Sequence, residues 1–335
     1  MRALVTGASG FIGRRLVASL ARRGHDVACL VRRTSNTACL DGLPVTLVVG
    51  DLRDPASLDA AAEGRDRVFH LAGIVQAVDD ADFEACNIEG TRNLIDSCLR
   101  AASKLERFVL VSSIAAAGPS GPDLPGTEAD EPRPVSSYGR SKLAAERIVL
   151  GAADRLPVAI IRPPNVLGPG SKELERAIGL VRKRIVPEVG DGRPRTSLID
   201  VDDLVDALVL AAMDVRSIGQ TYYVTDGQAY AWPEITAALA GELGVGRFRV
   251  GVPFGVQILA ARLSESAARL TGRTPALTRE IVRAGRDLFW LYDGSKICRE
   301  LGFRPRSTMR DSVRRAVRET GRENGRKHVR RDARA

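Results

Sequence analysis

MRALVTGASGFIG, residues 1–13, joins a short apolar strand to a turn with three glycines, and the amphipathic stretch 11–23 follows it. A strand that enters such a turn and then a helix holds the pyrophosphate of a dinucleotide. Gly7 permits the tight turn, Gly10 lets backbone approach phosphate, and Gly13 lets the helix lie close to the strand. The N–H groups that begin the helix then face the anion. The contacts are predicted from Gly7, Ser9, Gly10, Phe11, Ile12 and Gly13.

The composition is that of an ordinary globular protein. The chain has 335 residues, 44% hydrophobic and 27% charged. The first strand follows Met1 directly and no apolar run approaches about 20 residues, so we expect neither a signal peptide nor a transmembrane segment. Five scattered cysteines without a Cys-x-x-Cys pair indicate reduced thiols, and three histidines make a histidine metal site improbable. We therefore expect a cytoplasmic protein without a metal.

Most of the positive charge lies at the carboxyl end. The formal net charge is +9, and residues 310–335 carry six of these charges. We expect residues 321–335 to be a disordered, solvated basic tail, with weak attraction to anionic lipid as the alternative. The tail has no aromatic side chain on which bases could stack, so a specific nucleic-acid partner is not predicted.

Strand-like and helix-like stretches alternate through the first two hundred residues. The expected strands are 3–6, 26–31, 45–49, 67–71, 107–111 and 158–162, and the expected helices are 11–23, 55–62, 82–102 and 137–151. This alternation predicts an α/β fold of Rossmann type, with a doubly wound parallel sheet.

The regular alternation of strand-like and helix-like stretches ends at residue 162. We expect residues 1–162 and 196–225 to form the dinucleotide-binding domain, the latter with a helix at 200–213 and a strand at 220–224. Residues 163–195 and 226–320 are expected to form a smaller, mostly helical substrate-binding lobe.

Tyr138 and Lys142 are four residues apart, so they share one helix face. A free tyrosine has a pKa of about 10, and a nearby ammonium group favours the phenolate. Lysine can also donate to ribose hydroxyls. Ser113 follows the strand 107–111, where parallel sheets bind ligands, and its hydroxyl would reach a substrate carbonyl. The alternatives are an exposed Tyr–Lys pair and a serine that only ends the strand.

Together these motifs resemble the extended short-chain dehydrogenases/reductases, over about residues 1–320. That superfamily contains the NAD-dependent epimerases/dehydratases, the 3β-hydroxysteroid dehydrogenases and the dihydroflavonol reductases. The resemblance is carried by TGASGFIG at 6–13, GDL at 50–52, HLAG at 70–73, NIEGTRNL at 87–94, SS at 112–113, YGRSK at 138–142 and RPPNVLGPG at 162–170.

The resemblance implies a role for each matching residue. Ser113, Tyr138 and Lys142 would form the catalytic set, with Asn87 near the nicotinamide unless it only caps a helix. The further cofactor contacts would come from Asp51 and Leu52 at the adenine, from the backbone of Leu71, Ala72 and Gly73, and from the backbone of Pro163 and Val166 at the carboxamide.

The end of the second strand bears on the choice of cofactor. NAD-preferring members usually place an acid there, whereas this chain has Val31 followed by Arg32 and Arg33. Either arginine would suit a 2′-phosphate, so NADP(H) is the expected cofactor. NAD(H) is the alternative if both are ordinary surface residues.

An exchangeable NADPH suits net carbonyl reduction, and we expect interconversion of a ketone and a secondary alcohol. The dehydratases of the family carry Thr-Asp-Glu where this chain has Ser113-Ile114-Ala115, so water elimination is not expected. The alternative is a nucleotide-sugar 4-epimerase that retains NAD, with Arg193 or Arg195 at the sugar diphosphate. A third class is a non-catalytic sensor or scaffold, which the intact Ser113, Tyr138 and Lys142 disfavour.

The substrate is accordingly an apolar ketone or alcohol, or a nucleotide sugar. The apolar segment 252–263 would line a pocket, touch a membrane surface or form a core helix. A homodimer through two sheet-flanking helices is an arrangement that the resemblance allows.

Overall fold

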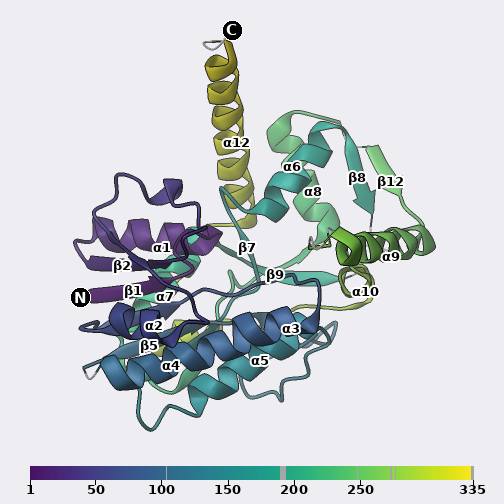
Figure 1. Cartoon of the computed structure of the whole chain (residues 1–335). Coiled ribbons are helices and arrows are strands. Elements are labelled where there is room, and N and C mark those ends of the chain that lie inside the picture. The colour runs from purple at the N-terminus through teal and green to yellow at the C-terminus, as the bar shows by residue number, and fades with distance from the viewer. Residues whose placement is uncertain (103, 189–193, 247, 272–273, 276, 333–335) are drawn as a thin grey trace.

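A parallel sheet with helices on both faces forms the larger part of the molecule (Figure 1). The computed structural model describes residues 1–102, 104–188, 194–246, 248–271, 274–275 and 277–332. Within them the main sheet has seven parallel strands in the order β10-β6-β5-β4-β1-β2-β3. These are β1 (Arg2–Thr6), β2 (Asp26–Val31), β3 (Thr46–Val49), β4 (Arg67–His70), β5 (Arg107–Val111), β6 (Val158–Arg162) and β10 (Gln220–Tyr223).

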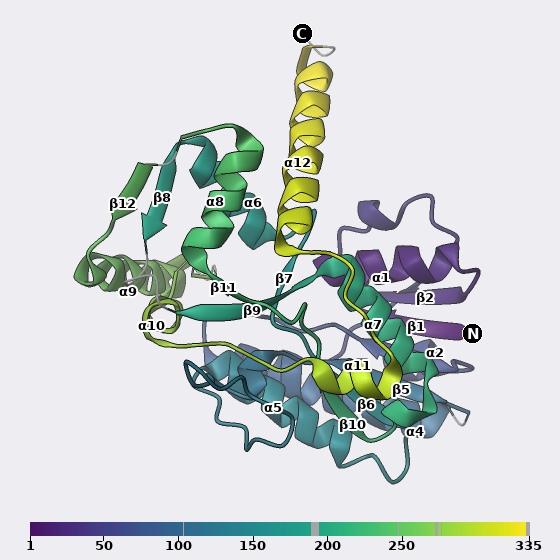
Figure 2. The ribbon, with the colours of Figure 1, turned by 180° about the vertical axis from the view of Figure 1, so that it is seen from behind.

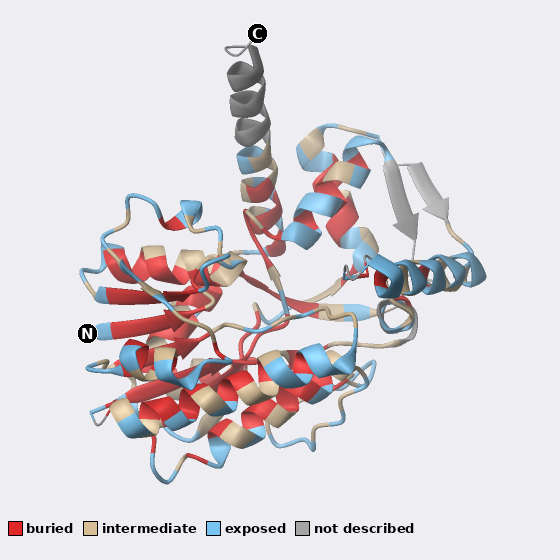
Figure 3. Cartoon of the chain, in the orientation of Figure 1, coloured by how far each residue is buried: buried red, intermediate tan, exposed pale blue. Residues whose placement is uncertain are grey.

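The strand order reverses beside β1, whose neighbours are β2 and β4. In such sheets ligands bind at the carboxyl ends of the strands next to this switch point. Two separate apolar cores cover the faces. One contains side chains of α1 (Phe11–Arg22) and α7 (Val201–Met213), and the other contains those of α2 (Pro55–Ala62), α4 (Gly90–Ala101) and α5 (Ser137–Leu150). The predicted Rossmann-type, doubly wound fold is confirmed. Its inner strands are largely buried, whereas the edge strand β3 is mostly exposed (Figure 3).

The second lobe has its own small sheets and core (Figure 2). In its described part, β11 (Ala229–Ala231), β9 (Arg195–Asp200) and β7 (Asn165–Leu167) form one sheet, and β12 (Phe248–Gly251) pairs with β8 (Ile185–Glu188). The remaining helices of the lobe are α6 (Lys172–Arg182), α8 (Trp232–Leu243), α9 (Phe254–Thr271), α10 (Arg279–Asp287) and α12 (Met309–Asp332). Helices α6, α8 and α12 share one apolar core.

Three segments differ from the expected boundaries. Strand β9, most of which was expected in the dinucleotide-binding domain, pairs with β7 and β11 in the sheet of the second lobe. Helix α11 (Ser295–Leu301) lies in the stretch expected in the substrate lobe, but Ile297 and Leu301 are buried in the core beneath α1 and α7. The expected tail is helical as far as Asp332, as a continuation of α12. Val313 anchors α12 in the core of the second lobe, and the arginines, lysine and glutamate that follow are good helix formers.

The expected helix 82–102 is divided. Helix α3 (Asp80–Phe83) leads into η2 (Glu84–Glu89), a π-helical turn, and then into α4. Single π-helical turns inside helices are frequent at functional sites. Asn87 lies in this turn.

Candidate active site

The glycine-rich turn packs closely against neighbouring backbone. Gly7 has φ +70°, and a Cβ there would lie 2.7 Å from the amide nitrogen of Ala72. A Cβ on Gly13 would overlap the carbonyl oxygen of Gly7. The first turn of α1, which the structure describes in full, carries no acidic side chain, and Gly10 at the N-cap has no side chain to occupy the amides. These features fit the pyrophosphate of a dinucleotide, whose oxygens would take those N–H groups as donors.

A chain of hydrogen bonds fixes the loop that follows β4. The N–H of Ala72 donates to Thr6 Oγ1 (3.1 Å), and Thr6 contacts Nδ1 of His70 (2.7 Å). Nε2 of His70 contacts Thr91 (3.0 Å), whose hydroxyl donates to the carbonyl of Asn87 (2.6 Å). Because Thr91 uses its proton on Asn87, Nε2 of His70 donates to Thr91 and Nδ1 accepts from Thr6. Burial lowers the pKa of His70 to about 3, so the ring is neutral.

The predicted adenine and ribose contacts lie near one another at the ends of β2 and β3. Val31 is buried, and Arg32 and Arg33 after it are exposed. The pKa of Asp51 is lowered, first by hydrogen bonding to Arg53 and to a smaller extent by the positive charge of Arg32. The pairing of Asp51 with Arg53 could not be anticipated from the motif.

Leu52 is buried in the core between α2 and α4. Its carbonyl oxygen accepts a hydrogen bond from Asn93 Nδ2 at 2.8 Å. The side chain of Leu52 therefore supports the fold at this point.

Helix α5 brings Tyr138 and Lys142 to the end of β5. The helix begins at Ser136, whose hydroxyl accepts from the N–H of Gly139 (3.0 Å). Tyr138 is half-buried, and its phenol lies near the hydroxyl of Ser113. Burial raises the pKa of Tyr138 to about 12, and the nearby Ser113 hydroxyl offsets part of this rise. The structure thus brings the three candidate catalytic residues to one place.

Lys142 does not have the expected effect on the tyrosine in this structure. Its buried ammonium group donates to the carbonyl oxygen of Val111 at 2.8 Å. Burial lowers the pKa of Lys142 to about 8, against the charge of Glu146, which raises it. The pKa of Tyr138 is therefore raised, and not lowered as expected, because burial is the largest influence on the phenol.

Asn87 connects two parts of the site. Its amide exchanges hydrogen bonds with the backbone of Ile74 (2.8 and 3.0 Å) and donates to Ser141 Oγ (2.9 Å). Ser141 in turn donates to the carbonyl of Tyr138 (2.8 Å). Asn87 thereby holds the loop after β4 against α5 and does not act as a helix cap.

A buried ion pair lies behind α5 and was not predicted from the sequence. Glu146 Oε2 lies 2.6 Å from Arg162 Nη2, both side chains are less than a tenth exposed, and Ser112 also donates to Glu146. Arg162 donates further to the hydroxyl of Tyr223 at 2.9 Å. Only the four-residue spacing of Lys142 and Glu146, which places both on one helix face, hinted at this network.

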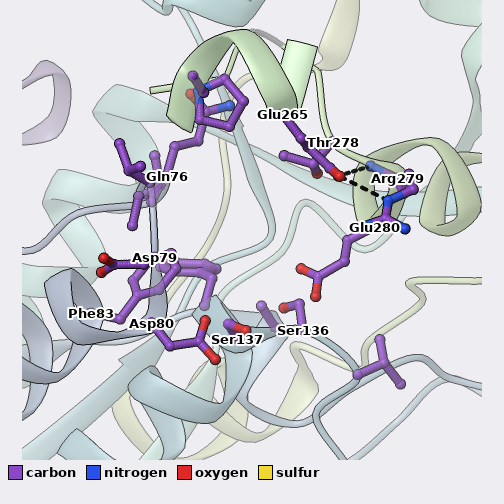
Figure 4. A pocket seen from close by; sticks show the side chains of 18 of the residues that line it. Gln76, Asp79, Asp80, Phe83, Ser136, Ser137, Glu265, Thr278, Arg279 and Glu280 are labelled. Carbon is purple, nitrogen blue, oxygen red and sulfur yellow. Dashed lines mark hydrogen bonds and ion pairs between the residues drawn. The ribbon is translucent and has the colours of Figure 1, made fainter. Parts of the chain in front are cut away.

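A cavity of about 830 Å³ opens beside Tyr138. Residues 75–83 form one wall, helices α9 and α10 form the other, and Ser136 and Ser137 lie between them (Figure 4). Arg279 Nε donates to Glu265 at 2.8 Å and joins α9 to α10. The apolar part of the lining consists of Val75, Ala77, Val78, Phe83, Ala115, Val135, Ala268, Pro275, Leu288 and Trp290.

Other predicted residues of the described chain do not line the cavity. The carbonyl of Pro163 accepts from the N–H of Ile114 (3.0 Å), and Val166 lies in β7. Arg195 begins β9 and is exposed, and Arg193 lies outside the described residues. The apolar segment 252–263 is not among the lining residues, since the contribution of α9 to the cavity comes from 265–269. No cluster of three or more potential metal ligands occurs in the part of the chain that the structure describes.

The fold and this arrangement define a dinucleotide-dependent enzyme of the extended short-chain dehydrogenase/reductase type. Residues 3–224 match the NAD dependent epimerase/dehydratase family, and the chain belongs to it. It is accordingly an NAD(P)-dependent oxidoreductase/epimerase.

Two curated relatives align over nearly the whole chain. Sterol demethylase protein B of Methylococcus capsulatus is 33% identical and covers 92% of this chain and 95% of its own. The 4-hydroxy-2-methyl-3-oxo-4-farnesyl-3,4-dihydroquinoline-1-oxide ketoreductase of Stigmatella aurantiaca is 30% identical, with coverages of 92% and 93%. Among solved structures, MoeE5 in complex with UDP-glucuronic acid and NAD is 27% identical, covers 96% of this chain and 100% of its own, and has a TM-score of 0.78.

Proposed function

We propose that this protein reduces an apolar ketone to a secondary alcohol with NADPH. The observation that carries the proposal is the position of a protonated phenol, Tyr138, at the wall of a large and mainly apolar cavity. The two relatives support it, because one is named for a sterol and the other for the reduction of a farnesylated ketone.

Each residue of the set has a distinct task. Bound NADPH supplies the hydride. Tyr138 donates its phenolic proton to the substrate oxygen, and a pKa of about 12 keeps that proton in place at neutral pH. Ser113 lies near the phenol and orients the same substrate oxygen. Lys142 is protonated at pH 7 and provides a cation for the ribose hydroxyls.

Asn87 is a positioning residue, because it acts through Ser141 on the backbone of Tyr138. The cofactor preference rests on Arg32 and Arg33 at the end of β2, where an exposed guanidinium group suits a 2′-phosphate.

The experiment measures NADPH oxidation with ketones of increasing apolar size, from short alkanones to 3-ketosteroids, and identifies the alcohol by mass spectrometry. We expect kcat/KM to rise with apolar size and NADPH to be preferred over NADH. A clear preference for NADH would overturn the cofactor assignment, and turnover of none of the ketones would overturn the reaction.

The second candidate function is a nucleotide-sugar 4-epimerase, favoured by the likeness to MoeE5 in complex with a UDP-sugar. The two functions differ in what the purified protein retains. An epimerase would carry NAD that survives gel filtration and would interconvert UDP-sugars without net NADPH consumption. Native mass spectrometry of the purified protein distinguishes them.

A further inference from the structure

Helix α9 exposes the apolar side chains that a packed helix normally buries. The alanines at 261 and 268 are buried, with 0% and 5% exposure. The larger apolar residues point outward, with exposures of 54% for Val256, 56% for Leu259, 63% for Leu263 and 88% for Leu270. Figure 3 shows the helix as mainly exposed along its length.

These side chains form one continuous stripe. Positions 256, 259, 263 and 270 follow one another at intervals of three, four and seven residues, which is the spacing of a single helix face. The exposed alanines at 260 and 267 fill the gaps. At 1.5 Å per residue the stripe is about 21 Å long. We call these six residues the outer stripe: Val256, Leu259, Ala260, Leu263, Ala267 and Leu270.

A positive charge lies beside the outer stripe. Arg262 is exposed and follows Leu259 by three residues, so it lies at one edge of the stripe. The acidic residue of α9, Glu265, faces inward and pairs with Arg279. The outward surface of α9 is therefore apolar and cationic.

We propose that the outer stripe rests on the surface of an anionic phospholipid membrane. A helix with an apolar face and arginines at its edge lies in the plane of the membrane interface, where leucines enter the acyl boundary and arginines meet lipid phosphates. No helix among the described residues is long and apolar enough to cross a bilayer, so the contact is peripheral.

The position of α9 relates this surface to the cavity. Glu265, Ala268 and Arg269 line the cavity from the same helix whose opposite face carries the outer stripe. A membrane contact would thus place one wall of the substrate cavity next to the lipid phase, into which apolar ketones partition. The membrane contact itself does not depend on the proposed reaction.

The test is flotation of the full chain with vesicles of phosphatidylglycerol and, separately, of phosphatidylcholine. We expect binding to the anionic vesicles and an about tenfold or greater loss in the variant L259S/L263S/L270S, because the three leucines that would enter the acyl boundary are removed. The matched control, L124S/L150S/V215S, replaces apolar residues that are 79%, 42% and 73% exposed elsewhere, and should bind as the wild type does. Arg262→Gln should weaken binding to anionic vesicles alone.

Absence of vesicle binding by the wild type, or equal binding by the L259S/L263S/L270S variant, would overturn the proposal. Sedimentation velocity without lipid tests the alternative that a second copy of this chain occupies the outer stripe. That alternative would be correct if the wild type were a dimer and the L259S/L263S/L270S variant a monomer. Because flotation requires no turnover, its result is independent of whether any ketone is reduced.

Discussion

The ammonium group of Lys142 hydrogen bonds at 2.8 Å to the carbonyl oxygen of Val111, the last residue of β5. Two residues later Ser113 lies near the phenol of Tyr138, so α5 approaches this strand end at two points. Burial lowers the pKa of Lys142 to about 8 and raises that of Tyr138 to about 12. Both groups hold their protons at pH 7, which suits proton delivery to a ketone oxygen.

Replacement of Tyr138 by phenylalanine tests that assignment. The variant keeps the ring that packs near Phe83 (centroids 6.2 Å apart) but loses the proton donor. We expect kcat to fall by about 10²–10⁴-fold, with unchanged affinity for NADPH in a fluorescence titration. Tyr230→Phe is the control, since its hydroxyl bonds to Asp226 away from the cavity. Retained turnover in Tyr138→Phe would contradict the role.

The glycine at position 13 permits the contact between α1 and the turn before it. In Gly13→Ala the new methyl group would overlap the carbonyl of Gly7, so the turn must open and its amides move. We expect a large loss of NADPH affinity in calorimetric titration and a lower melting temperature. Gly241→Ala in α8, where a Cβ meets nothing within 4 Å, should instead stabilise the protein by about 0.4–1 kcal/mol. Normal NADPH binding by Gly13→Ala would exclude this turn as the phosphate site.

Arg32→Ala tests the cofactor preference. If the guanidinium group binds a 2′-phosphate, kcat/KM should fall about 10- to 100-fold with NADPH and hardly change with NADH. Arg33→Ala shows which of the two arginines makes the contact. The exposed Arg155 provides the comparison, because Arg155→Ala should affect neither cofactor. Equal losses with both cofactors would point to a general effect of charge.

The buried pair of Glu146 and Arg162 predicts a large effect on stability. Glu146→Gln leaves a buried guanidinium group without its counter-charge, and we expect a loss of about 3–5 kcal/mol in urea unfolding. Glu131→Gln breaks the exposed pair with Arg133, whose side chains are 79% and 83% exposed, and should change stability by less than about 0.5 kcal/mol. Similar losses of unfolding free energy in both variants would show that burial does not determine how much an ion pair contributes to stability.

The neutral His70 makes stability depend on pH. Its pKa lies at about 3 in the folded protein against an ordinary value of 6.5, so the unfolded chain binds a proton in this window and the folded protein does not. Stability therefore falls as the pH falls below 6.5. Relative to His70→Gln, the unfolding free energy of the wild type should fall by about 1.4 kcal/mol for each pH unit between about pH 6.5 and pH 4.5. If the difference in unfolding free energy between the wild type and His70→Gln did not change with pH, His70 would be protonated in the folded protein as well.

The sequence alone determined the order of strands and helices in the dinucleotide domain and the position of the glycine turn. Those features depend on the local periodicity of apolar residues and on the steric needs of a few glycines, which a sequence records directly. The spacing of Tyr138 and Lys142 likewise fixed their shared helix face.

Only the tertiary structure decided what covers each face. The bond from Lys142 to Val111, the cavity between residues 75–83 and α9, and the pair of Glu146 with Arg162 each join segments from different parts of the chain. The apolar pattern of α9 is the same whether its leucines meet a core or solvent. Periodicity shows that a helix has two faces, and the packing of distant segments determines which face is buried.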